Sequence, residues 1–112
     1  MKYRYLLFNE KEITNFKNIE RILNDQGFYW LIDAEFEDAE IEIKNDTILW
    51  HSGTWLSGTW VYGIWLNGDF RWGTWENGIM EDGNFINGNW NSGIMKSGKI
   101  NDSVNIGVIN KK

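Results

Sequence analysis

The sequence contains no cysteine, one histidine and no long apolar run, and each shortage removes a class of function. Without cysteine the chain can form neither a disulfide framework nor a thiolate metal site or nucleophile. His51 alone cannot complete an ordinary zinc site, so we expect no metal and no cofactor. No segment approaches the roughly 20 apolar residues of a membrane span, and the apolar run within residues 1–8 is too short for a signal peptide. We therefore expect no membrane contact, and a cytoplasmic location in a bacterial host or a place in a virion.

The net charge of the chain limits the kinds of partner that it is expected to bind. The 112 residues carry a formal net charge of −5, which disfavours direct nucleic-acid binding because that affinity comes from Lys and Arg on phosphates. Six carboxylates and no base lie within residues 33–42. A pair from this run, Asp33 included, could serve acid/base chemistry or hold a hard cation, but no calcium-loop spacing is present and a solvated face is the ordinary interpretation. Five of the six are candidate partner-binding residues: Glu35, Glu37, Asp38, Glu40 and Glu42.

Residues 1–47 are predicted to form a small α+β cap. Asn9 followed by Glu12 has the spacing of a capping box, so a helix is expected to begin there. Gly27 is placed to end that helix in a left-handed conformation. Three strands are expected from their apolar content or alternation, at residues 2–8, 28–32 and 40–43.

A five-residue repeat dominates residues 48–104, and residues 105–112 are predicted to be a tail. Glycine recurs at every fifth position from Gly53 to Gly98, usually after Ser, Asn or Asp, which favour turns. A second column of large apolar residues has the same period: Trp50, Trp55, Trp60, Trp65, Phe70, Trp75, Met80, Phe85, Trp90, Met95 and Ile100. A period of five fits neither a helix nor a flat strand, so each unit must contain a corner.

This pattern resembles the pentapeptide-repeat family, whose coils stack into a right-handed quadrilateral β-helix. The resemblance covers about residues 50–102 and implies a mainly β fold, a β-solenoid in which the large central residues point inward. Four units to a coil would stack Trp50 on Phe70 and Trp90, with the N-terminal cap covering the first coil. The chain departs from the family's usual pattern in having Gly where Ala or Cys is usual, and mostly Trp where Leu or Phe is usual.

An antiparallel β-meander is the alternative fold. Asn-Gly pairs at 67–68, 77–78 and 87–88 are typical of two-residue hairpin turns. The Gly-x-Trp-x-Asn-Gly segments at 63–68 and 73–78 also resemble the core of MORN repeats, which implies hairpin sheets of that kind.

Catalytic residues are hard to find in this chain. Four of its five serines occupy the turn position of the repeat, and regularly spaced glycine without a Walker pattern indicates a fold signature and no phosphate loop. We therefore expect that the protein is not an enzyme. Tyr62 and Trp72 stand outside the central column and are the candidates for exposed aromatic contacts.

Three functions follow from these observations. The first is a non-enzymatic structural or protein-interaction module that works through a protein partner or self-association. The Gly-Thr-Trp pentads also look like small bacteriophage proteins, which implies a virion component or an accessory protein. The alternatives are an acidic, DNA-mimic-type inhibitor of a host nucleic-acid enzyme, and a carbohydrate-binding module that uses exposed aromatics.

Overall fold

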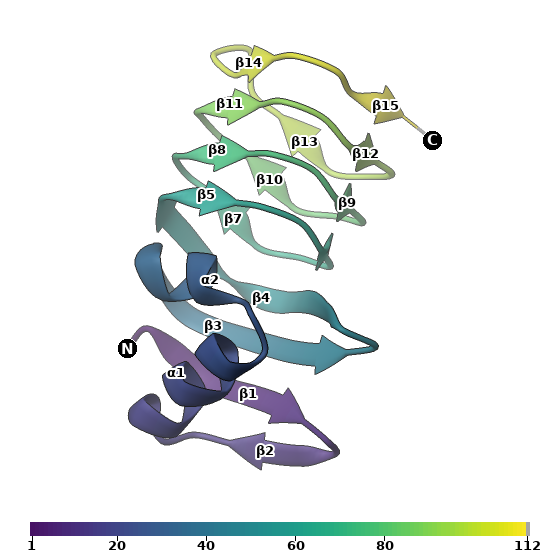
Figure 1. The fold of residues 1–112 in the computed structure, drawn as a ribbon. Coiled ribbons are helices and arrows are strands. Elements are labelled where there is room, and N and C mark those ends of the chain that lie inside the picture. Colours follow the sequence, from purple (N-terminus) through teal and green to yellow (C-terminus); the bar gives the residue numbers. More distant parts are fainter. Residues whose placement is uncertain (112) are drawn as a thin grey trace.

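The computed structural model describes residues 1–111 and consists of an N-terminal α+β part below a stack of coils (Figure 1). The N-terminal part contains β1 (Tyr3–Phe8), β2 (Lys11–Ile13), α1 (Phe16–Asp25), α2 (Tyr29–Asp33) and β3 (Glu35–Lys44). The long strand β4 (Thr47–Ser57) leads into the coils. The coils carry β5 (Thr59–Trp60), β6 (Ile64–Trp65), β7 (Asp69–Phe70), β8 (Thr74–Trp75), β9 (Ile79–Met80), β10 (Asn84–Phe85), β11 (Asn89–Trp90), β12 (Ile94–Met95), β13 (Lys99–Ile100), β14 (Asn105–Ile106) and β15 (Asn110–Lys111). Neither helix in these 111 residues has the length and apolar character needed to cross a membrane.

The repeat region is a β-solenoid, as predicted, and it has about four turns. All strand pairs between coils are parallel, so the antiparallel meander is wrong for this region. The expected coil of four units is also wrong. Trp50 pairs with Trp65, and not with Phe70, so one coil holds fifteen residues and three pentads.

The repeat glycines form the corners of the three-sided coil. The ten repeat glycines all have positive φ, between 101° and 146°, a range that side chains rarely adopt. At Gly88 an added Cβ would also overlap the carbonyl oxygen of Gly73 in the coil below. Glycine at this position therefore permits both the backbone conformation of the corner and the close approach of successive coils.

The three sides form three rows of short strands. One row runs β4–β6–β9–β12–β15, and a second runs β4–β7–β10–β13. Because β4 is long enough to belong to both, these rows form one sheet with β1, β2 and β3. The third row, β5–β8–β11–β14, is a separate four-stranded sheet that faces the viewer in Figure 1.

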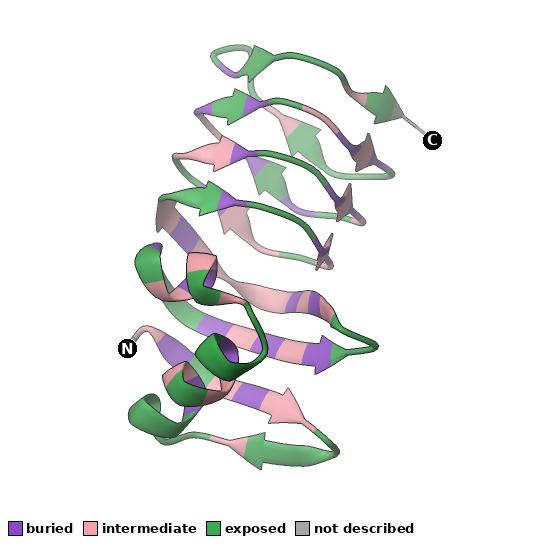
Figure 2. Ribbon diagram, in the orientation of Figure 1, coloured by how far each residue is buried: buried purple, intermediate pink, exposed green. Residues whose placement is uncertain are grey.

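The inward side of each row is a column of large apolar residues. Figure 2 shows one buried position in strand after strand up the stack, and the central residues from Trp50 to Met95 are at most 4% exposed. Indoles fifteen residues apart are stacked: the ring centroids of Trp60 and Trp75 lie 5.2 Å apart at 12°. The prediction that the large residues point inward is confirmed.

The predicted helix of the N-terminal part is present, but its predicted start is wrong. Helix α1 begins at Phe16 after Asn15, whose side chain accepts a hydrogen bond from the backbone N–H of Asn18 at 3.0 Å. Asn9 and Glu10, where the helix was expected to start, have positive φ and form the turn of the β1–β2 hairpin. Asn tolerates a positive φ well, so Asn9 forms a turn and does not cap a helix.

The apolar run 28–32 is not a strand, because it forms most of helix α2. Its short helix packs at a corner of the first coil, where the Trp30 ring lies 5.3 Å from that of Trp60. The strands predicted at 2–8 and 40–43 are confirmed within β1 and β3, and Gly27 follows α1 with a φ of +87°.

The N-terminal part covers the first coil, as expected. Phe36 and Ile41 of β3 pair with Trp55 and Trp50 of β4, so they extend two core columns downward. Ala39 lies under the corner at Gly53, where an added Cβ would lie 2.9 Å from the Ala39 Cα. The antiparallel β3 therefore supplies the base of the stack.

The segment set apart as residues 105–112 contains two of the strands. Asn105 pairs with Asn89, sixteen residues earlier, so the last coil has one extra residue. This insertion brings Ile106 into register with Trp90.

Candidate functional site

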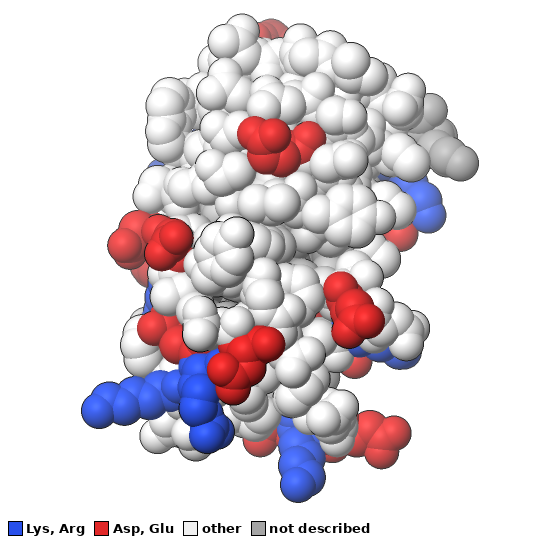
Figure 3. All heavy atoms as spheres, viewed as in Figure 1, with Lys and Arg blue, Asp and Glu red and all other residues white. Residues whose placement is uncertain are grey.

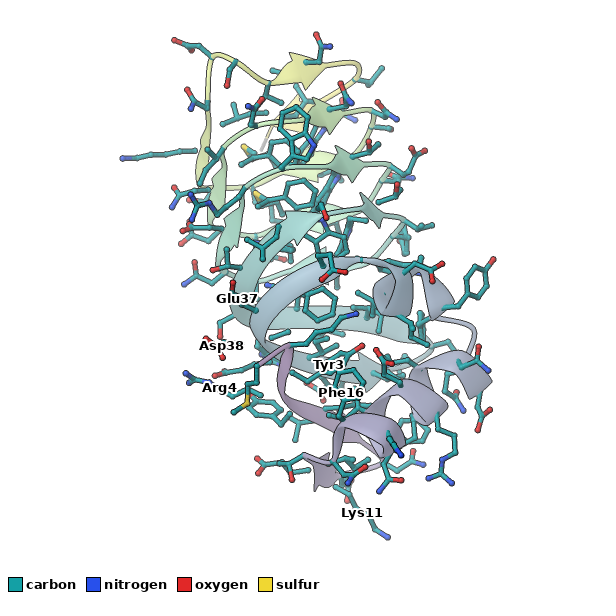
Figure 4. The ribbon with its side chains drawn as sticks, turned by 90° about the vertical axis from the view of Figure 1, so that its left-hand side faces the viewer. Tyr3, Arg4, Lys11, Phe16, Glu37 and Asp38 are labelled. Carbon is teal, nitrogen blue, oxygen red and sulfur yellow. The ribbon has the colours of Figure 1, made fainter. Side chains whose placement is uncertain are left out.

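The candidate carboxylates lie along β3 and point away from the core. Phe36 and Ile41 point inward between them, and Glu35, Glu37 and Asp38 are exposed. Asp38 has a φ of 54° and sits where the β3–β4 register shifts, so it forms a bulge. Its carboxylate lies 3.7 Å from the N-terminal amine. Figure 4 shows Glu37, Asp38 and Arg4 following one another along one edge of the molecule.

Glu40 and Glu42 are half-buried, and both have partners. Glu40 lies 3.3 Å from the guanidinium of Arg4 and accepts a hydrogen bond from the Tyr5 hydroxyl at 3.2 Å. Burial, followed by the charge of Glu40, raises the pKa of Tyr5 above its usual value. Glu42 lies 2.9 Å from Nε2 of His51, on the same row of the sheet. These interactions hold β1 and β4 to β3, so they account for both carboxylates.

Glu35 and Glu37 differ from the other three because no ion pair involves them within residues 1–111. Glu35 pairs with Ser57 and Glu37 pairs with Thr54 across the β3–β4 ladder. Thr54 in turn pairs with Asp69 on its other side. The outward side of β3 thus carries unpaired negative charge next to the second row of the solenoid.

Trp72 lies at the same corner as Glu35. It directly precedes Gly73, and a Cβ added at Gly73 would overlap the carbonyl oxygen of Gly58, the residue after Ser57. Because Ser57 pairs with Glu35, the tryptophan and the carboxylate flank Ser57 from the coil above and the strand below. The indole is 54% exposed, unlike those in the core.

A shallow hollow of about 270 Å³ extends this corner toward α2. Tyr29, Trp30 and Asp33 line one side of it, and Gly58 and Thr59 line the other. Tyr29 is 63% exposed. We call this surface the acidic corner and define it by Tyr29, Asp33, Glu35 and Trp72. Glu37 lies at a different corner, under Gly53 and next to Asp38.

Tyr62 does not belong to the acidic corner. It is 55% exposed and lies at the opposite end of the β5 side, where it lines a different hollow with Asn77 and Ile79. The predicted partner-binding residues therefore divide into three groups. Glu35 and Trp72 lie at the acidic corner, Glu37 and Asp38 lie under Gly53 beside the paired carboxylates Glu40 and Glu42, and Tyr62 stands apart.

The sequence analysis missed Tyr29, because the run that contains it was expected to be a buried strand. In α2, Tyr29 is exposed whereas Leu31 is fully buried. In a strand, side chains two residues apart would lie on the same face, whereas in a helix they point in different directions.

Charge is distributed unevenly over the molecule. In Figure 3 charged side chains gather over the N-terminal elements, whereas the face over β5, β8 and β11 is largely uncharged. No group of three His, Cys, Asp or Glu side chains in the described part of the chain is close enough to hold a metal ion.

The class of protein that this geometry defines is a β-solenoid with fifteen residues to a coil and an N-terminal α+β cap. Comparisons with protein-family models, with curated proteins and with solved structures gave no match. The relation to pentapeptide repeats therefore stays a prediction from the sequence.

The exposure of Trp72 can be checked by fluorescence quenching. Six of the eight indoles are fully buried and Trp30 is half-buried, so Trp72 should account for most of the emission that acrylamide quenches. In the Trp72→Phe variant we expect a blue-shifted emission maximum and at least a halving of the quenching constant. An unchanged constant would mean that a core indole is accessible. Tyr62→Phe, which removes no indole, is the control.

Proposed function

We propose that this chain is a non-enzymatic interaction module that binds a basic segment of a partner protein at the acidic corner. The observation that carries the proposal is the juxtaposition of unpaired Glu35 with the exposed indole of Trp72 on a rigid corner. Carboxylates form charge-assisted hydrogen bonds with Arg and Lys, and aromatic faces attract the same cations.

The solenoid suits this role because its backbone hydrogen bonds fix the conformation of the acidic corner. Each coil is joined to the one below by backbone hydrogen bonds, such as Thr74 N–H to the Gly58 carbonyl at 3.0 Å and Arg71 N–H to the Trp55 carbonyl at 2.8 Å. The turn between β7 and β8, which carries Trp72, is therefore fixed relative to β3, which carries Glu35. A preformed surface binds with little loss of conformational entropy.

Titration calorimetry with an arginine-rich peptide and with a peptide of the same length carrying Gln in place of Arg tests the proposal. We expect the basic peptide alone to bind, more weakly as salt screens the charges. Each charge-assisted hydrogen bond contributes about 1.5–3 kcal/mol, so the double variant Asp33→Asn/Glu35→Gln should raise Kd at least tenfold. Trp72→Ala should also weaken binding.

The matched control is Glu10→Gln, which removes an exposed carboxylate at the β1–β2 turn and should leave Kd unchanged. Equal weakening by this control would indicate attraction to net charge alone and would contradict a specific corner. Light scattering on the free chain tests the other route to function, self-association. A stable oligomer that buries Trp72, detected as loss of its quenching, would also contradict the proposal.

A further inference from the structure

The hollow beside Tyr62 lies at a different corner from the proposed protein-binding surface. It is an open depression of about 300 Å³ where the third row of strands turns into the row that contains β9 and β12. Its side chains come from four successive coils and are Tyr62, Asn77, Ile79, Ser92, Ile94 and Asn110. This volume is at the lower end of the range for small-molecule sites.

The repeat itself creates the hollow. Tyr62, Asn77 and Ser92 occupy the turn position of three successive coils, and each directly precedes a corner glycine. Gly78 and Gly93 contribute no side chain, so the chain recedes between the residues on either side. With coils spaced as hydrogen-bonded strands are, the distance from the coil of Tyr62 to that of Asn110 is about 14 Å. The site is therefore an elongated trough along the solenoid axis.

Among the residues whose side chains the structure describes, those that line this trough carry no charge. Its polar groups are the amides of Asn77 and Asn110 and the hydroxyl of Ser92, and its apolar groups are two isoleucines and the ring of Tyr62. The Asn77 Oδ1 atom accepts a hydrogen bond from the Gly78 N–H at 2.8 Å, which orients the amide and leaves its Nδ2 group to donate outward. The lining thus combines an exposed ring with neutral hydrogen-bonding groups, of which the Asn77 amide is held in place.

We infer that this trough binds a neutral sugar chain, with one sugar ring against the phenol ring of Tyr62. A sugar ring presents C–H groups on its faces, which pack on an aromatic ring, and hydroxyls at its rim, which pair with amides and hydroxyls. Asn77 and Ser92 lie one coil apart along the trough, so they contact hydroxyls of the same or adjacent sugars. An anionic ligand such as a nucleotide would find no cation among the described side chains of this lining to neutralise its phosphate.

Protein NMR with a panel of neutral trisaccharides tests the inference. The probes are the trisaccharides of glucose, mannose, galactose and N-acetylglucosamine at millimolar concentration, and the readouts are saturation transfer to the sugar and shifts of the Asn77 and Asn110 side-chain amides. We expect at least one trisaccharide to shift these amides. Tyr62→Ala should raise its Kd at least tenfold, whereas Tyr62→Phe should preserve binding because the ring remains.

Tyr29→Ala is the matched control, because it removes a similarly exposed tyrosine from the other corner. It should leave sugar binding unchanged, and Tyr62→Ala should leave binding of the basic peptide unchanged, so the two proposals fail separately. The inference is overturned if no trisaccharide shifts the trough amides, if sugar binding survives Tyr62→Ala, or if AMP binds the trough while the neutral sugars do not.

Discussion

Gly88→Ala should lower the free energy of unfolding by about 3–5 kcal/mol, one of the largest effects expected from a single methyl group in this protein. Two costs add. The residue has a φ of +112°, which strains any side chain, and the new Cβ would overlap the carbonyl oxygen of Gly73. That oxygen accepts a hydrogen bond from the Asn89 N–H at 2.9 Å, so it cannot move aside without breaking the link between coils. Denaturant unfolding followed by tryptophan fluorescence measures the change.

Gly27→Ala is the control that separates the two costs. Its φ of +87° imposes backbone strain as well, but nothing lies within 4 Å of an added Cβ. We expect a loss of only about 1–2 kcal/mol there. If the two variants were equally destabilised, the close approach of coils at the glycine corner would not be what requires glycine.

The sequence predicts the solenoid but gives the wrong number of sides. The five-residue period of Trp and Gly indicates a corner in every unit and is the same for any number of units to a coil. The number three is encoded elsewhere: Ile64, Ile79 and Ile94 are fifteen residues apart, each directly before a central residue. In the structure these isoleucines pair in register on one row. A second period, at a position outside the core, was the signal that identifies the coil.

The N-terminal errors have a different cause. The segment 28–32 is continuously apolar, and periodicity cannot distinguish a buried strand from a short helix in such a run. Contacts with distant residues decide the outcome, because Trp30 has to reach Trp60 at the base of the stack. Local sequence does not contain that information.

The sequence identified individual residues of the candidate site, but it did not show which of them lie together on one surface. The exposure of Tyr62 and Trp72 follows from their position outside the central column, and the structure confirms it. The sequence does not show which carboxylates remain unpaired. Strand pairing alone brings Glu40 to Arg4 and Glu42 to His51. The neighbourhood of Glu35 and Trp72 depends on the three-sided coil, so a four-sided coil would have placed Trp72 elsewhere.

Trp75→Ala should also cost about 3–5 kcal/mol, because it leaves a cavity at the centre of the stack. The indole is fully buried and stacks on Trp60 below and Trp90 above, with ring centroids 5.2 Å and 4.7 Å away. Trp72→Ala is the matched control, three residues away and exposed, and should change stability by no more than about 0.5 kcal/mol.

The shape of the unfolding curve is as informative as its midpoint. In a solenoid each coil is stabilised mainly by its neighbours, and Trp75 joins the coil of Trp60 to the coil of Trp90. Its loss weakens both interfaces at once, so the coils beyond Trp75 should unfold before the capped N-terminal half. We expect a second, earlier transition in Trp75→Ala that is absent from Trp72→Ala, and hydrogen exchange should assign it to residues after 75. A single transition, shifted as a whole, would mean instead that the cap and all coils unfold as one cooperative unit.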